Sequence, residues 1–176
     1  MTRLISVLLA SLVVTANAFA GGDAYDESLL TTDAFQEAWE ALDWEGAYLV
    51  LQPSESSANS HPADLMILAG MYLDDDFSNL GTKRERALKY WALSERAALT
   101  GYEPAVIELA NAFRWDDEFL GYESDTETAD CLDGIIDQRA YVSPDKNWLD
   151  EGMVKKCLLL KSAPGSDAYN DSDVSQ

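Results

Sequence analysis

One pattern of residues occurs twice in this chain, 41 positions apart. Residues 68–76 read LAGMYLDDD and residues 109–117 read LANAFRWDD. A repeat of this length is typical of stacked helix pairs, in which a small residue lets two helices approach while a leucine and an aromatic fill the groove. One helix pair cannot bury its own apolar face, so the neighbouring pair is expected to complete the core. The repeated residues are Leu68, Ala69 and Tyr72 in the first copy and Leu109, Ala110 and Phe113 in the second.

The rest of the chain also shows apolar residues at helical spacing, and no stretch shows the strict alternation of a half-buried strand. Thr32 is the expected N-cap of the first helix, and Gly101 is the expected glycine after a long helix. The apolar run 46–52 fits a strand or a buried helix, and its helical neighbours favour a helix. We predict an all-α chain of about six or seven helices in antiparallel pairs. The expected helices are 32–44, 46–52, 63–73, 83–99, one opened by Glu103 and Pro104, 126–138, and one at 143–160 with Ser143 as N-cap and Pro144 after it.

The repeat resembles a Sel1-like repeat protein, a relative of the tetratricopeptide solenoids. Two departures from that family are that only Gly81 remains of the usual Gly-x-Gly in the loop, and that Asn111 stands where the first copy has Gly70. The resemblance covers residues 63–115 and implies a short α/α superhelical solenoid over residues 32–161. It is carried by LAGMY at 68–72, Ala87, Tyr90, Ala97, Ala98, Gly101, Ala105, Leu109, Ala110 and Phe113.

The chain begins with the features of a secretory signal peptide. Arg3 precedes an apolar run, and small residues follow at Ala16, Ala18 and Ala20. We predict a signal peptide at residues 1–20, cleaved after Ala18 or Ala20, and a mature protein in the periplasm or outside the cell. A membrane anchor is the alternative, although the apolar run is short for a membrane span. Residues 21–31 are expected to form a polar leader, and residues 162–176 a disordered acidic tail.

Two cysteines, Cys131 and Cys157, are the only ones in the sequence. Because an exported protein meets an oxidising environment, we predict one disulfide between them. Closing a loop of this length is expected to stabilise the fold by about 3 kcal/mol, mainly by restricting the unfolded chain. A reactive thiol is the alternative, but no histidine lies near either cysteine in the sequence.

The formal net charge is -20, from 32 acidic and 12 basic residues. Such an excess of acid disfavours binding to nucleic acid or to an anionic membrane surface, because both depend on lysine and arginine. It suits a protein partner with a basic surface, and it also suits a protein that is simply very soluble.

The aspartates after the first repeat copy partly match a calcium-binding EF-hand loop. If Asp74 is position 1, Asp76 takes position 3 and Glu85 takes position 12. Asn79 and Gly81, however, occupy positions that require glycine and a β-branched apolar residue. We therefore expect a solvated repeat loop, with no metal and no cofactor.

Paired aspartates recur at the corresponding loops of the two copies, and aromatic residues accompany the acids in the second loop, which predicts a partner-binding edge. Packing of the aromatics against the cysteine-bearing helices is the alternative. The predicted partner-binding residues are Asp74, Asp75, Asp76, Trp115, Asp116, Asp117, Glu118, Phe119 and Tyr122.

Enzymatic chemistry has little support in this sequence. His61 is the only histidine and lies in a Ser-rich segment, where we expect an exposed loop residue. No G-x-S-x-G motif is present, and no two carboxylates stand out as a catalytic pair. We predict an exported, non-enzymatic protein-binding module. By resemblance this implies an immunity protein that neutralises a secreted antibacterial effector such as a phospholipase. An adaptor or assembly factor of a cell-envelope complex is the alternative, and a small periplasmic hydrolase is a further one.

Overall fold

The computed structural model describes residues 26–114, 124–142 and 148–160. Within these ranges the chain contains seven α-helices and three short 3-10 segments. The one β-type pairing there is an isolated antiparallel bridge between Tyr102 and Trp148. The prediction of an all-α fold is confirmed.

The elements follow one another with short connections. They are η2 (Leu29–Thr31), α2 (Asp33–Glu40), α3 (Trp44–Leu51), η3 (Gln52–Glu55), α4 (Pro62–Leu73), η4 (Asp75–Leu80), α5 (Lys83–Ala98), α6 (Glu103–Arg114), α7 (Thr126–Val142) and α8 (Glu151–Leu158).

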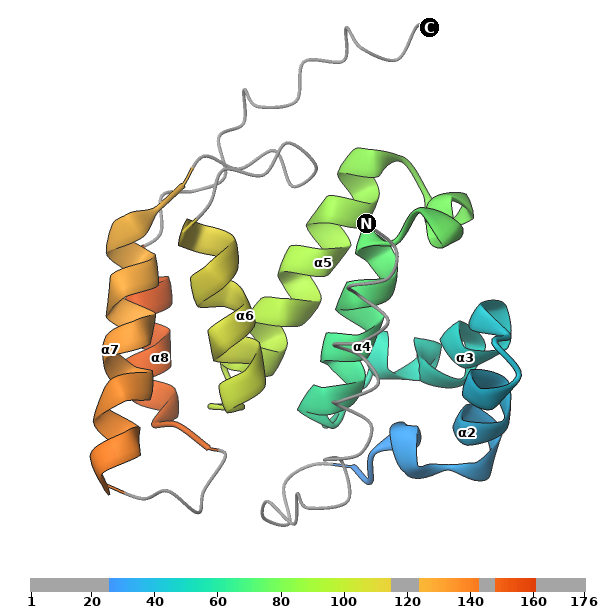
Figure 1. The fold of residues 1–176 in the computed structure, drawn as a ribbon, viewed down its shortest axis with the longest axis horizontal. Coiled ribbons are helices and arrows are strands. Elements are labelled where there is room, and N and C mark those ends of the chain that lie inside the picture. Colours follow the sequence, from blue (N-terminus) through green and yellow to red (C-terminus); the bar gives the residue numbers. More distant parts are fainter. Residues whose placement is uncertain (1–25, 115–123, 143–147, 161–176) are drawn as a thin grey trace, which may run out of the picture.

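Consecutive helices pack against each other in pairs. Helix α2 packs on α3, α4 on α5 and α6 on α7, while α5 also contacts α6 and α8 contacts α7. The result is a row of helices with α2 and α3 at one end and α7 and α8 at the other (Figure 1). From α3 to α7 the neighbours in this row follow the order of the sequence, whereas α8 lies beside α7.

The repeated residues lie in the core, and the two repeated aromatics make contacts between pairs. All six are buried. The ring of Tyr72 on α4 lies edge-on to Tyr48 on α3, with centroids 6.3 Å apart. The ring of Phe113 on α6 lies 5.2 Å from Trp91 on α5. In both copies, then, the repeated aromatic packs on an aromatic from the preceding helix pair.

Local capping explains where several helices begin. The Thr32 hydroxyl accepts a hydrogen bond from Phe35 N at 3.4 Å, so the predicted N-cap of α2 is confirmed. Helix α5 begins with a capping box formed by Thr82 and Glu85. Glu103 opens α6, as predicted.

The connection between α5 and α6 requires a glycine. Gly101 has φ 77°, a left-handed conformation that favours glycine. A Cβ at this position would also collide with the carbonyl oxygen of Leu149. The two backbones lie this close because Leu149 N donates to Gly101 O at 2.7 Å.

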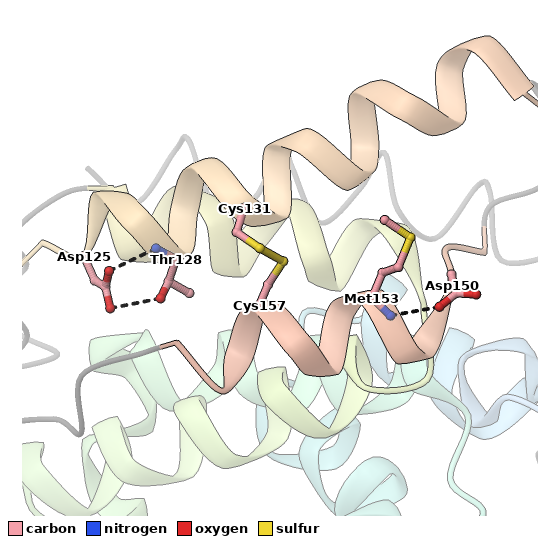
Figure 2. The surroundings of a disulfide bond; sticks show 6 residues. All are labelled: Asp125, Thr128, Cys131, Asp150, Met153 and Cys157. Atoms are coloured by element: carbon pink, nitrogen blue, oxygen red, sulfur yellow. Dashed lines mark hydrogen bonds between the residues drawn. A yellow bond between two sulfur atoms is a disulfide. The ribbon is translucent and has the colours of Figure 1, made fainter.

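This backbone pairing also explains why the last helix begins later than predicted. Trp148 and Leu149 pair with the α5–α6 turn, so they are extended rather than helical. Asp150 then acts as N-cap and accepts from Met153 N at 2.8 Å (Figure 2). The prediction that this helix is continuous from Pro144 was wrong, and Ser143 and Pro144 themselves lie outside the described residues.

Two further boundaries differ from prediction. Helix α2 ends at Glu40 rather than continuing to Trp44, because Leu42 adopts a positive φ and Asp43 begins a new helix by capping Gly46 N. Helix α7 continues to Val142, beyond the predicted end at Gln138.

The predicted disulfide is present. Cys131 on α7 and Cys157 on α8 are bonded, with Cα atoms 5.6 Å apart (Figure 2). The bond holds the short helix α8 against α7, the helix with which it makes its main contacts.

Among the described helices, none combines the length and apolarity needed to cross a membrane. The predicted signal peptide and the predicted acidic tail lie outside the described residues.

Candidate functional site

Buried polar side chains gather where α3 is joined to α4. In the described part of the chain, eight polar or charged residues are buried, and five of them belong to this α3–α4 junction. The five are Ser28, Ser54, Ser60, His61 and Asp64. Buried polar groups are costly without partners, and Ser28, Ser54, Ser60, His61 and Asp64 all form hydrogen bonds at this junction.

Asp64 lies at the centre of the junction and is only 1% exposed. One of its carboxylate oxygens accepts from the Ser28 hydroxyl at 2.7 Å. The other accepts from Leu29 N at 3.0 Å and from the Ser54 hydroxyl at 3.4 Å. Asp64 therefore ties the segment before α2 and the segment after α3 to helix α4. Burial, reinforced by the negative charge of Asp64, raises the pKa of Tyr102 to about 12.

Arg96 reaches the same junction from α5. Its guanidinium donates to the carbonyl oxygens of Glu55 at 2.5 Å, Ser54 at 2.7 Å and Ser57 at 2.8 Å. Burial lowers the pKa of Arg96, and the nearby Glu55 partly opposes that effect. The Ser60 hydroxyl donates to Ser54 O at 2.6 Å, so two side chains hold this stretch of backbone.

A second group of polar side chains lies beside the first and is centred on Glu55. Its carboxylate accepts from the Tyr72 hydroxyl and from Lys89 Nζ, the latter at 2.7 Å. The hydroxyl oxygens of Tyr72 and Tyr48 are 3.3 Å apart. Burial raises the pKa of Tyr72, and its bond to Glu55 raises it further. Tyr72 is thus held as a hydrogen-bond donor, and Glu55 forms an ion pair with Lys89. Because these three residues belong to η3, α4 and α5, their interactions join the three elements.

His61 is buried, at 8% exposure, and is not the exposed loop residue expected from the sequence. Its Nδ1 accepts a hydrogen bond from Ala63 N at 3.2 Å, which makes it the N-cap of α4. Burial lowers the pKa of His61, while Asp64 acts in the opposite direction. Since Nδ1 is the acceptor of a backbone amide, it cannot donate to a carboxylate as the histidine of a Ser-His-Asp triad does.

The first group of predicted partner-binding residues has partly structural roles. The Asp74 carboxylate accepts from Asp76 N at 2.9 Å and thereby begins η4, of which Asp75 is the first residue. The Asp74 carbonyl accepts from Arg86 at 2.8 Å. Asp76 is exposed.

The second group of predicted partner-binding residues lies outside the described residues. Its members are Trp115, Asp116, Asp117, Glu118, Phe119 and Tyr122. The expectation that they share one edge with Asp74, Asp75 and Asp76 stays a prediction.

The residue at position 12 of the partial EF-hand has another role. Glu85 accepts from Thr82 N at 2.8 Å and from the Thr82 hydroxyl at 2.9 Å. The bond from the Thr82 backbone, followed by the bond from its side chain, lowers the pKa of Glu85. In residues 26–114, 124–142 and 148–160, no group of three or more His, Cys, Asp or Glu side chains is arranged to hold a metal ion.

A surface that the sequence reasoning missed lies on the α2–α3 pair. Leu42, between the two helices, has φ 57° and is 67% exposed, and Leu49 on α3 is 57% exposed. Exposed carboxylates surround them in the sequence, at Glu40, Asp43 and Glu45. Two sequence signals point to this surface: a leucine where a helix usually ends in glycine, and the absence of lysine and arginine from residues 4–82.

Comparisons of the chain with models of protein families, with curated proteins and with solved structures found no match. The resemblance to Sel1-like repeats rests on residues 63–115 of the sequence and stays a prediction.

Proposed function

We propose that this chain is an exported, non-enzymatic protein-binding module, built as a short Sel1-like solenoid whose acidic surface binds a basic protein. The contacts of Tyr72 with Tyr48 and of Phe113 with Trp91 support the solenoid, because in both copies the repeated aromatic packs on an aromatic of the preceding helix pair. Export is supported by the disulfide, since such bonds persist in oxidising compartments.

The observation that carries the proposal is the separation of charge along the chain. Residues 4–82 contain no lysine or arginine, whereas α5 alone contains five. Three of these five reach back to the acidic part: Lys89 pairs with Glu55, while Arg86 and Arg96 bind backbone carbonyls. The acidic side chains of the α2–α3 pair are exposed to solvent, which suits a partner with a positive surface.

The roles of the potentially reactive side chains also support a binding protein over an enzyme. Cys131 and Cys157 are joined in a disulfide. His61 caps a helix through Nδ1, and Asp64 is engaged by three donors. A catalytic base or nucleophile needs a lone pair directed at a substrate, and these side chains direct theirs at the protein itself.

The partner that we propose is a secreted antibacterial effector, such as a phospholipase, which the protein neutralises by covering its active site. The experiment is a growth competition between cells that release the effector and recipient cells with or without the gene for this protein. Recipients that export the protein are expected to survive, and recipients in which it lacks residues 1–20 are expected to be killed. The purified protein, added in equal amount, should abolish the lipid-hydrolysing activity of the effector.

Three results would count against this proposal. Equal survival of recipients with and without the gene would exclude the immunity role, and recovery of the protein with an envelope complex would favour an assembly factor. Hydrolysis of a substrate by the purified protein itself, lost in His61→Ala, would favour an enzyme.

A further inference from the structure

We infer that the α2–α3 pair is the docking surface of this protein and that it accepts a segment of another protein carrying lysine or arginine beside an apolar side chain. This inference rests on the proposed binding function and identifies where the partner is held. The surface, called the hairpin surface below, consists of Glu40, Leu42, Asp43, Glu45 and Leu49.

The apolar part of the hairpin surface contributes nothing to the folded core. Leu42 is among the most exposed large apolar side chains in the described residues. It occupies a left-handed backbone conformation that is unfavourable for a bulky residue and normally belongs to glycine or asparagine at a helix end. Exposure and backbone conformation both favour a smaller residue here, so the leucine is explained by contact with something outside the fold.

The second exposed leucine, Leu49, belongs to α3. Glu45 and Leu49 are four residues apart in α3, and therefore share one face of that helix. Leu42 is in the turn that leads into the first residue of α3. An acidic residue, Glu45, thus stands between the two exposed leucines in the sequence.

Contacts within the α2–α3 pair hold the backbone of the hairpin surface in place. The rings of Phe35 and Trp39 are stacked with centroids 5.5 Å apart, and Trp39 meets Trp44 edge-on at 5.1 Å. Asp43 fixes the turn by accepting from Gly46 N at 2.9 Å. A preformed surface loses little conformational entropy on binding, which favours affinity.

The charge of the surface determines the kind of partner. Within the part of the chain that the structure describes, no lysine or arginine forms an ion pair with the exposed carboxylates of residues 33–45. These carboxylates belong to Asp33, Glu37, Glu40, Asp43 and Glu45. An apolar anchor surrounded by such charge is complementary to an apolar side chain flanked by basic ones.

The position of the pair leaves this end of the molecule open to a partner. Helices α2 and α3 form one end of the row, opposite α7 and α8 (Figure 1). The ring of Phe77 on η4 packs on Tyr48 of α3, with centroids 6.2 Å apart, which brings the acidic loop of Asp74 and Asp76 next to the pair. A second copy of the chain is a poorer occupant, because two molecules of net charge -20 repel each other.

The first test uses a defined probe. A fluorescein-labelled peptide of 14 or so residues, with lysine and leucine at amphipathic helical spacing, is titrated with the mature disulfide-bonded protein at low salt, and fluorescence anisotropy is measured. The Leu42→Ser/Leu49→Ser variant is expected to bind the peptide at least tenfold more weakly. The matched control is Leu159→Ser/Leu160→Ser, which removes two exposed leucines at the opposite end of the row, and it should bind as the wild type does.

Leu42→Gly separates binding from folding. Glycine favours the positive φ of this position, so the midpoint of thermal unfolding is expected to stay the same or rise. Its affinity for the peptide is nevertheless expected to fall. A variant that is as stable as the wild type and binds more weakly identifies Leu42 as a contact residue.

The outcomes distinguish this inference from the proposed function. Equal peptide affinity of the wild type and Leu42→Ser/Leu49→Ser, or tighter association of the protein with itself than with the peptide, would overturn the docking surface. If the double variant still protects recipient cells as well as the wild type, the surface is wrong while the immunity function stands. If the wild type does not protect and yet the hairpin surface binds the peptide, the immunity function is wrong while the surface stands.

Discussion

At the scale of single residues, the α3–α4 junction shows how a buried polar group organises the backbone around it. Asp64 accepts from one backbone amide and two serine hydroxyls that lie 10 to 36 positions away in the sequence. An apolar residue at position 64 would leave those donors without a partner in a buried place, which costs more than the loss of one hydrogen bond. The junction is therefore specific for a carboxylate with this geometry.

His61 makes the stability of the fold depend on pH. Its pKa lies below the ordinary value of 6.5, chiefly because the ring is buried, so the unfolded chain binds a proton at a higher pH than the folded chain does. The unfolded state gains that proton as the pH falls below about 6.5, and the free energy of unfolding decreases. We expect the free energy of unfolding to be lower at pH 5.5 than at pH 7.5, measured by urea unfolding at both values.

The matched variant for this measurement is His61→Asn. Asparagine is a good N-cap and does not titrate, so helix α4 keeps its cap while the proton-dependent contribution is removed. The variant should lose less stability than the wild type over the same pH range. Equal losses in the two proteins would show that another group is responsible.

At the scale of elements, α8 depends on the disulfide more than the other helices do. It has only eight residues and packs mainly on α7, to which Cys157 is bonded. Cys131→Ser/Cys157→Ser is expected to lower the free energy of unfolding by about 3 kcal/mol, because a loop with a separation of 26 residues is no longer closed in the unfolded chain.

Limited proteolysis locates this effect. Lys155 and Lys156 are exposed on α8, and trypsin should cleave there much faster in the double serine variant than in the wild type. The variant is expected to keep most of its far-ultraviolet helical signal, since α2 to α6 contain neither cysteine. Unchanged cleavage at these lysines would mean that packing alone holds α8 in place.

The helices were predictable because their signals are local. Thr32 lies directly before α2. In each copy of the repeat, the leucine, the alanine and the aromatic residue lie within a stretch of five residues. The disulfide was predictable because only one pairing of two cysteines exists within a chain. The start of α8 was not predictable, since the pairing of Leu149 with Gly101 joins residues 48 positions apart.

The proposed docking surface was harder to predict for a related reason. The exposure of Leu42 follows from the turn between α2 and α3, whereas the spacing of apolar residues predicted one longer helix through that position. The burial of His61 follows from the first turn of α4, which begins at Pro62 rather than after it. The acidic loops were predicted from their composition. Composition shows where charged residues are, but it does not show which of them contact the rest of the fold.

At the scale of the whole molecule, the net charge of -20 opposes compaction. Salt screens this repulsion, so the midpoint of thermal unfolding is expected to rise by several degrees between about 20 mM and 500 mM NaCl. Peptide binding at the hairpin surface should weaken over the same range, because screening also reduces attraction to a basic segment.

With rising salt, the unfolding midpoint should increase while the peptide affinity decreases. Measuring both in one protein tests whether its negative charge causes both effects. The unfolding midpoint should respond much less to salt near pH 4, since the isoelectric point of the sequence is about 4.1. A midpoint that falls with salt at neutral pH would indicate that ion pairs, such as Lys89 with Glu55, outweigh the general repulsion.

The reach of Arg96 back to the α3–α4 junction has a consequence for the order in which the protein acquires its structure. The carbonyl groups of Ser54, Glu55 and Ser57 accept hydrogen bonds from Arg96, which follows them by 39 to 42 positions in the sequence. These hydrogen bonds can form only after α5 has packed against the junction. The first two helices therefore do not form a self-sufficient folding unit. During synthesis of the chain, α5 has to emerge before the N-terminal part can become native, which leaves the exposed acidic hairpin accessible to chaperones until that moment.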